Sequence, residues 1–214
     1  MAVSAAAFEG KVTQSIRGKD KAMIFTYAMK DGFLRMEPQT PEAHGTAMIF
    51  DYAKKEMIIM MPEKKMYMTM SLQGAIDSAG QAAGHNSSQN ISKTGKTETI
   101  LGYPCEQYLS KGEKGETIEI WVTDKLGMFM GLGSGGGPMG GRRGGGGDQA
   151  WEQLVKGKEG FFPLRVNVHD ASGKESFALE TKSVEPGSLP ASIFTPPDDY
   201  KTLSIPGMGG MMHP

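Results

Sequence analysis

Apolar side chains recur at every second position through much of the first 70 residues, and this alternation constrains the fold more than any other feature. A period of two is typical of half-buried β-strands, because successive side chains of a strand point to opposite faces of the sheet. Residues 23–29 and 66–70 show it most clearly, and the dipeptide Asp31-Gly32 marks a tight turn. Short turns join antiparallel neighbours, so residues 8–70 predict a meander of about six antiparallel strands.

The rest of the chain adds further strands and a few helices. Strands are predicted over 97–100, after a polar stretch at 85–96, and then over 102–109, 116–123, 164–169 and 177–180, with a hairpin turn at 170–173. Residues 71–83 have helical spacing with Ser71 as N-cap, and another helix is expected to start at 148–151. The chain is therefore expected to be mainly β, of the α+β class, with about ten strands and helices inserted between strand groups.

Charge and cysteine content exclude several classes of protein. The 23 basic and 24 acidic side chains leave a net charge of −1, which gives no general attraction to nucleic acid or to anionic lipid. No apolar run approaches the roughly 18 residues of a transmembrane helix. Cys105 is the only cysteine, so an intramolecular disulfide and a zinc site of paired cysteines are excluded, and this residue is expected to be a small buried hydrophobe.

Neither the glycines nor the histidines form a pattern that indicates catalysis or a cofactor. Of the 30 glycines, 12 lie in 127–147 without the Lys-Ser/Thr that closes a phosphate-binding loop, so 131–147 is expected to be a flexible inserted loop. The four histidines lack the spacing of a metal site, and no nucleophile elbow occurs in a strand-turn-helix context. The prediction is a protein that is not an enzyme and needs no cofactor.

The two ends of the sequence are expected to lie outside a single folded domain that spans 8–201. Ala5 and Ala7 resemble the small residues before an export-signal cleavage site, so 1–7 is interpreted as the remnant of a trimmed signal peptide, with a frayed Ala-rich tail as the alternative. Residues 202–214 lack periodicity and are expected to be disordered. A copper-binding function stays an alternative hypothesis, because these residues include three thioether side chains and one imidazole: Met208, Met211, Met212 and His213.

Methionine carries the most specific functional signal. Of the 17 methionines, ten lie between Met23 and Met70, and in the strands at 23–29 and 66–70 they repeat at every second or fourth position and so share a face. An unbranched, polarizable thioether side chain conforms to ligands of varying shape, as an acyl chain requires. A sheet core that uses Met in place of Leu is the alternative.

Five short motifs occur along the chain: Gly102-Tyr103-Pro104-Cys105-Glu106-Gln107-Tyr108, Glu119-Ile120-Trp121-Val122-Thr123, Phe8-Glu9-Gly10-Lys11-Val12, Pro163-Leu164-Arg165 and Phe194-Thr195-Pro196-Pro197-Asp198-Asp199-Tyr200. They resemble an uncharacterised family of exported bacterial proteins, domain of unknown function 4412, which is similar to the LolA-like lipoprotein carriers. The resemblance covers 8–201 and implies a strongly curved antiparallel half-barrel, whose concave face is covered by helices and holds lipid. It also implies a periplasmic or otherwise exported location.

Together, the residues and the resemblance predict a non-enzymatic, monomeric periplasmic domain that binds a hydrophobic ligand, such as a lipid or a lipoprotein acyl chain. The side chains expected to line the concave face are Met23, Phe25, Tyr27, Met29, Met66, Met68 and Met70. Parity does not say which face is concave, so the opposite set, which includes Ile24 and Tyr67, stays open. A ligand-free envelope scaffold that contacts a protein partner through the glycine-rich loop is the second hypothesis.

Overall fold

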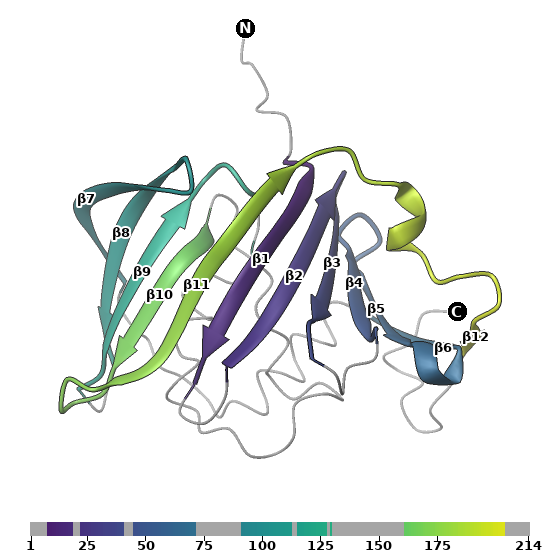
Figure 1. Cartoon of the computed structure of the whole chain (residues 1–214), viewed down its shortest axis with the longest axis horizontal. Coiled ribbons are helices and arrows are strands. Elements are labelled where there is room, and N and C mark those ends of the chain that lie inside the picture. Colours follow the sequence, from purple (N-terminus) through teal and green to yellow (C-terminus); the bar gives the residue numbers. More distant parts are fainter. Residues whose placement is uncertain are drawn as a thin grey trace, which may run out of the picture. The chain divides into compact units, whose positions relative to one another are not determined.

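The computed structural model describes residues 8–18, 22–40, 45–71, 91–112, 115–127, 129 and 161–203. Most of these residues lie in strands, which confirms the expected mainly β class (Figure 1). The strands are β1 (Gly10–Arg17), β2 (Ala22–Lys30), β3 (Phe33–Pro38), β4 (Ala47–Asp51), β5 (Glu56–Met61), β6 (Met66–Ser71), β7 (Ser92–Ile100), β8 (Tyr103–Lys111), β9 (Thr117–Thr123), β10 (Phe162–His169), β11 (Glu175–Pro186) and β12 (Lys201–Thr202). Two short 3-10 helices lie among the described residues, η2 (Pro62–Lys64) and η3 (Ala191–Phe194).

Hydrogen bonding orders the strands β12-β6-β5-β4-β3-β2-β1-β11-β10-β9-β8-β7 in a 12-stranded sheet, so β12 and β7 are its edge strands. The six strands expected in the first 70 residues are β1 to β6, which are neighbours in chain order. The predicted turn between β2 and β3 is confirmed. Asp31 and Gly32 both have positive φ, 46° and 79°, as a tight turn that matches the twist of a hairpin requires.

Two strands differ from the sequence prediction. β7 begins at Ser92, inside the polar stretch that was expected to precede it, because an exposed edge strand needs no apolar alternation. Its pairing with β8 shifts register between Lys93 and Thr97, where Gly95 has a φ of 80°. β12 pairs in parallel with β6, whereas the resemblance implies antiparallel pairing throughout, and its two residues are too few to show any periodicity.

The predicted helices cannot be compared with this structure. Residues 72–83 and 148–151 lie outside the described residues, and Ser71, the expected N-cap, is the last residue of β6. The single-domain range ends at Lys201 in the sequence prediction. In the structure the Leu203 amide still donates to the Tyr67 carbonyl oxygen at 2.7 Å, so ordered contacts continue two residues further.

The chain divides into two compact units. Among the described residues, the first unit contains β2 from Met23 onward, β3 to β6, β12 and residues 183–203. The second unit contains β7 to β10. Three strands contribute to both units, since the division falls after Thr13 in β1, after Ala22 in β2 and after Lys182 in β11.

The core of the second unit follows the predicted alternation of β9. Ile118 and Ile120 are paired with Val168 and Val166 of β10, and each of the four side chains is at most 1% exposed. Trp121 lies on the opposite face of the strand, as predicted. Burying β-branched side chains on facing positions of neighbouring strands is the ordinary way in which a sheet gains stability.

Cys105 is buried in β8 of the same unit, with 1% of its surface exposed, which confirms its expected role as a small hydrophobe. Its Sγ donates to the Tyr103 carbonyl oxygen at 3.4 Å. Burial raises the pKa of the Cys105 thiol, so the thiol stays protonated and is a poor nucleophile.

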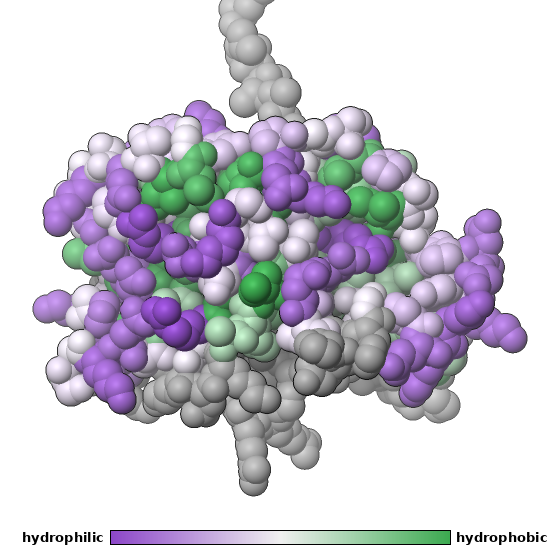
Figure 2. Space-filling model, in the orientation of Figure 1, coloured by the Kyte–Doolittle hydropathy of each residue, from purple (hydrophilic) through white to green (hydrophobic). Residues whose placement is uncertain are grey.

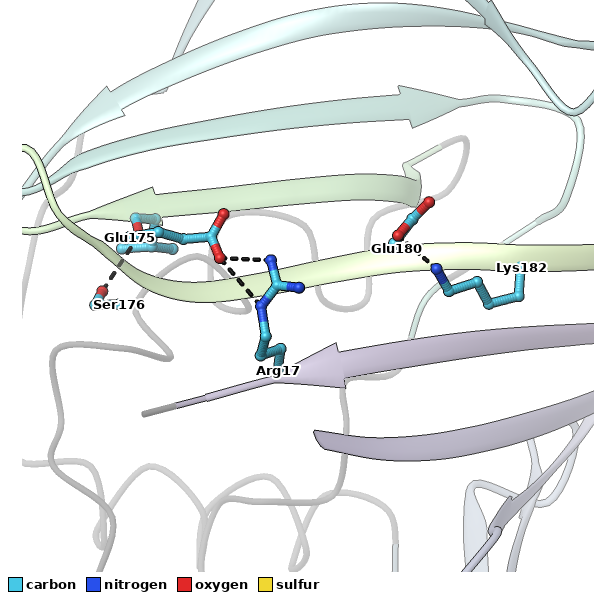
Figure 3. Close-up of polar contacts among 6 residues, drawn as sticks. Arg17, Glu175, Ser176, Glu180 and Lys182 are labelled. Atoms are coloured by element: carbon cyan, nitrogen blue, oxygen red, sulfur yellow. Dashed lines mark hydrogen bonds and ion pairs between the residues drawn. The ribbon is translucent and has the colours of Figure 1, made fainter. Parts of the chain in front are cut away.

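The second unit also carries exposed ion pairs from β1 and β11. Arg17 Nη2 lies 2.6 Å from Glu175 Oε1, and Lys182 Nζ lies 2.6 Å from Glu180 Oε2 (Figure 3). Figure 2 shows hydrophilic side chains interspersed with smaller hydrophobic areas on the face turned to the viewer. Because solvent screens such pairs, they contribute little to stability and are best understood as the solvated surface of the sheet.

Candidate functional site: the methionine face

Cross-strand pairing in the first unit places most of its methionines on one face of the sheet. Residues directly opposite each other in neighbouring antiparallel strands point to the same side. One row of partners runs from β2 to β6 as Tyr27, Met36, Met48, Ile59 and Met68. A second, parallel row consists of Met29, Leu34, Phe50, Met57 and Met70. This surface, with Met23, Phe25, Met61 and Met66 at the same parity, is called the methionine face below.

The seven side chains predicted to form the site share this face, but they are not equally buried. Five have exposed fractions of 9% or less: Phe25, Tyr27, Met29, Met68 and Met70. Met66 is half-buried, and Met23 is 40% exposed near the start of β2. The register therefore brings the residues of β2 and β6 onto one surface, with three intervening strands between them.

The sequence prediction missed the side chains that connect those two groups. Met36, Met48 and Met57 come from β3, β4 and β5 and are 0%, 9% and 8% exposed. The strands of Met48 and Met57 contain runs such as Met57-Ile58-Ile59-Met60-Met61, in which both parities are apolar, so the alternation does not identify a face there. The signal that identifies it is register, which follows from the tight turns between the strands.

The opposite face of this unit is closed by the chain itself. Leu189 and Phe194 pack against Ala28, Ala47, Ile49 and Met60, and the Phe33 and Phe194 ring centroids are 5.6 Å apart. Tyr67, from the alternative set, packs against this closed cluster, whereas Ile24 is 43% exposed. Since residues 189–200 already occupy the opposite face, the methionine face is the better candidate for a ligand.

Polar contacts hold the covering segment in place. Leu189 is fixed through its backbone, because its amide donates to Glu9 Oε1 at 2.6 Å and its carbonyl oxygen accepts from Lys30 Nζ at 2.8 Å. Further along, the Arg35 guanidinium donates to the Ile193 carbonyl oxygen at 2.7 Å. Near the end of the segment, Lys65 Nζ lies 2.8 Å from Asp199 Oδ2, which raises the pKa of Lys65 and lowers the pKa of Asp199.

A hollow of about 380 Å³ lies at the end of β3 and is lined by Glu37, Pro38, Gln39, Thr40 and Gly45. None of the predicted ligand-binding residues lines it. Within the described residues no cluster of three or more His, Cys, Asp or Glu side chains is arranged to hold a metal ion. In the same part of the chain, no helix has the length and apolar character needed to span a membrane.

Several predicted features lie outside the described residues. These are the signal-peptide remnant at 1–7, the glycine-rich loop at 131–147, and the copper-ligand cluster of Met208, Met211, Met212 and His213. They stay predictions from the sequence.

Solved structures that match the chain have low sequence identity to it. An uncharacterized conserved protein from Thermus thermophilus is 10% identical with a TM-score of 0.49, over 91% of this chain and 90% of that chain. A Pseudomonas aeruginosa MucA/MucB complex matches at 9% identity and a TM-score of 0.44, over 91% of this chain and 58% of that chain. A putative outer membrane lipoprotein-sorting protein domain from Vibrio parahaemolyticus matches at 10% identity and a TM-score of 0.33, over 86% of this chain and 87% of that chain. No curated protein matches the chain.

Two of the motifs that carry the family resemblance are neighbours in the fold. Gln107 and Tyr108 of the first motif are the cross-strand partners of Trp121 and Ile120 of the second. Residues that occupy facing positions in β8 and β9 constrain each other's size and shape, which gives the two motifs a structural origin. A family match over residues 8–200 agrees with them, and the chain belongs to the family described as Domain of unknown function (DUF4412).

Proposed function

We propose that this chain is an exported, non-enzymatic domain that binds a hydrophobic ligand, such as a lipid or a lipoprotein acyl chain, against the methionine face. One observation carries the proposal: of the ten methionines between Met23 and Met70, all except Met60 lie on that face. In the described strands of the second unit, the buried apolar positions are filled mainly by Ile, Val, Leu and Phe instead. Among the described residues, methionine is therefore concentrated on one surface.

The physical reason lies in the methionine side chain. Three rotatable bonds and a polarizable sulfur let it fill irregular spaces, so a surface built of it adapts to chains of different length and saturation. Burial of ligand hydrocarbon stabilises the complex by about 25 cal/mol per Å² of apolar surface removed from water. Charged groups are not needed for such recognition, which agrees with the net charge of −1.

The proposal includes a curved sheet that is covered by helices. The sheet is inferred to curve around the ligand, with the helix predicted over 71–83 and the one predicted from 148 covering it and moving when ligand enters. The family resemblance supports a periplasmic location. A monomer is expected, because binding through one internal face needs no second copy.

Methionine-methyl NMR tests the proposal directly. The full chain is labelled with [methyl-¹³C]methionine and titrated with a saturated long-chain fatty acid, and each signal is assigned through a Met→Leu variant. The expected result is a saturable shift of Met36, Met48, Met57, Met68 and Met70. Met60 lies on the opposite, closed face and serves as the internal control, so its signal is expected to stay in place.

Native mass spectrometry of gently purified protein gives the second readout, a co-purified lipid that survives in the gas phase. Absence of lipid together with unshifted methionine methyls at saturating fatty acid would contradict the proposal. The ligand-free scaffold would then be the function to pursue, with 131–147 as the segment to delete in a partner-capture experiment.

A further inference from the structure

Five of the six side chains on one face of the β5–β6 hairpin are methionine. The cross-strand pairs on this face are Met57 with Met70, Ile59 with Met68, and Met61 with Met66. Two of the three pairs thus place one thioether directly opposite another. The sixth side chain is Ile59, which is a hydrocarbon, so every heteroatom on this face of the hairpin is a methionine sulfur.

Strand formation does not explain this composition. The middle of the other face of the same two strands uses Ile58, Thr69 and Tyr67, which are strong strand formers, together with Met60, and the Glu56–Ser71 pair ends that face. A core that needed only volume and strand propensity would be served by Ile or Val on both faces. The methionines therefore indicate a requirement that belongs to the thioether group itself.

The register brings the sulfurs within mutual reach. Directly paired residues have Cβ atoms about 4.5–5.5 Å apart, and diagonal neighbours such as Met61 and Met68 are about 7–8 Å apart. A flexible methionine side chain spans these separations, so the sulfurs of Met61, Met66 and Met68 can converge on one small ion. Met61 and Met66 are half-buried, which leaves an ion a route from solvent, whereas Met68 is 6% exposed.

Soft thioether donors select soft cations, of which Cu(I) is the biological example. We propose that this hairpin face binds a soft monovalent cation, Cu(I) or its analogue Ag(I), through the thioether sulfurs of Met61, Met66 and Met68. Met57 and Met70 continue the donor set along the hairpin. The site is separate from the copper-ligand cluster predicted in the C-terminal tail, and it does not depend on lipid binding.

Ag(I) titration of the full chain, followed by native mass spectrometry and by methionine-methyl NMR, tests the proposal. The tail is first removed as a competitor through the full-length variant M208L/M211L/M212L/H213Q. This variant is expected to take up Ag(I) and to show shifted methyl signals for Met61, Met66 and Met68. Adding M61L, M66L and M68L to it is expected to weaken Ag(I) binding at least tenfold, with Cu(I) competition against bicinchoninate as the second measurement.

The matched control is M60L, which alters a methionine of the same strand on the closed face. Leu and Met have similar volumes, so all these variants are expected to fold, and their circular dichroism spectra verify it. The proposal is overturned when the tail variant takes up no Ag(I), or when M61L/M66L/M68L and M60L bind it equally well. Fatty-acid binding is scored separately, so failure of one proposal leaves the other distinguishable.

Discussion

Glu9 and Lys30 form an ion pair at 2.8 Å that also fixes the backbone of the segment covering the closed face. The same carboxylate oxygen accepts the Leu189 amide at 2.6 Å, and the same ammonium donates to the Leu189 carbonyl oxygen at 2.8 Å. Two charged side chains thus satisfy both backbone groups of one residue. This arrangement ties residues near the start of the chain to residues near its end.

Stability is expected to depend on pH through Glu9. The hydrogen bonds from Lys30 and from the Leu189 amide lower the pKa of Glu9 below its ordinary value of 4.5. Above that ordinary value the carboxylate contributes its full stabilisation, and the contribution is lost as the pH falls through the lowered native pKa. Glu9→Gln should therefore unfold more readily than the parent at neutral pH, and the difference should shrink in acid.

Urea unfolding at a series of pH values measures this difference. E180Q is the matched control, because it also removes one carboxylate, and its Lys182 partner and Glu180 itself are 49% and 61% exposed. Its free energy of unfolding is expected to equal that of the parent. A Glu9→Gln variant whose deficit is the same at every pH would contradict the linkage.

Packing of the methionine face is tested by Met36→Ala. Met36 is fully buried between Tyr27 and Met48, so truncation is expected to lower the free energy of unfolding by about 2–5 kcal/mol. Met23→Ala, at a side chain that is 40% exposed on the same face, is expected to change it by no more than about 0.5 kcal/mol. Equal effects of the two substitutions would show that Met36 does not belong to a packed layer.

The expected strands and the observed ones agree best where alternation is strict. β9 runs from Thr117 to Thr123, where alternation over 116–123 predicts a strand, and the seven expected site residues do share a face. Continuous apolar runs hide the face to which Met48 and Met57 belong, because period-two alternation vanishes when both sides of a strand are apolar. Their placement required the register of the neighbouring strands.

Contacts between distant parts of the chain were not predictable either. The fully buried Gln14 donates through Nε2 to the Pro163 carbonyl oxygen at 2.8 Å and to Thr181 Oγ1 at 3.1 Å. Nothing near Gln14 in sequence indicates that a buried amide has partners there. Such contacts follow from topology, since a buried polar group is tolerated only where the fold brings it a hydrogen-bond partner.

A substitution in the turn between β7 and β8 is expected to stabilise the protein. Leu101 and Gly102 have φ values of 51° and 84°, and Leu101 is 48% exposed. A leucine in left-handed backbone is strained, whereas Asn tolerates that conformation and is favoured in such hairpin turns. Leu101→Asn is therefore expected to raise the free energy of unfolding by about 1 kcal/mol. Leu101→Ala keeps the Cβ atom and its strain, so a gain of equal size in that variant would attribute the effect to the exposed side chain instead.

A substitution at Gly10, in the motif Phe8-Glu9-Gly10-Lys11-Val12, is expected to destabilise the protein. Its φ is 152°, and a Cβ atom there would collide with the Glu185 carbonyl oxygen and lie 2.9 Å from Pro186 Cα. Because backbone atoms cannot move aside cheaply, Gly10→Ala is expected to lower the free energy of unfolding by about 1–3 kcal/mol. A Cβ at Gly18, just beyond the end of β1, would meet nothing within 4 Å, so Gly18→Ala is the control and is expected to be neutral. The measurement is the thermal unfolding temperature of the two variants, and an unchanged value for Gly10→Ala would show that residues 8–10 and 185–186 are not in close contact.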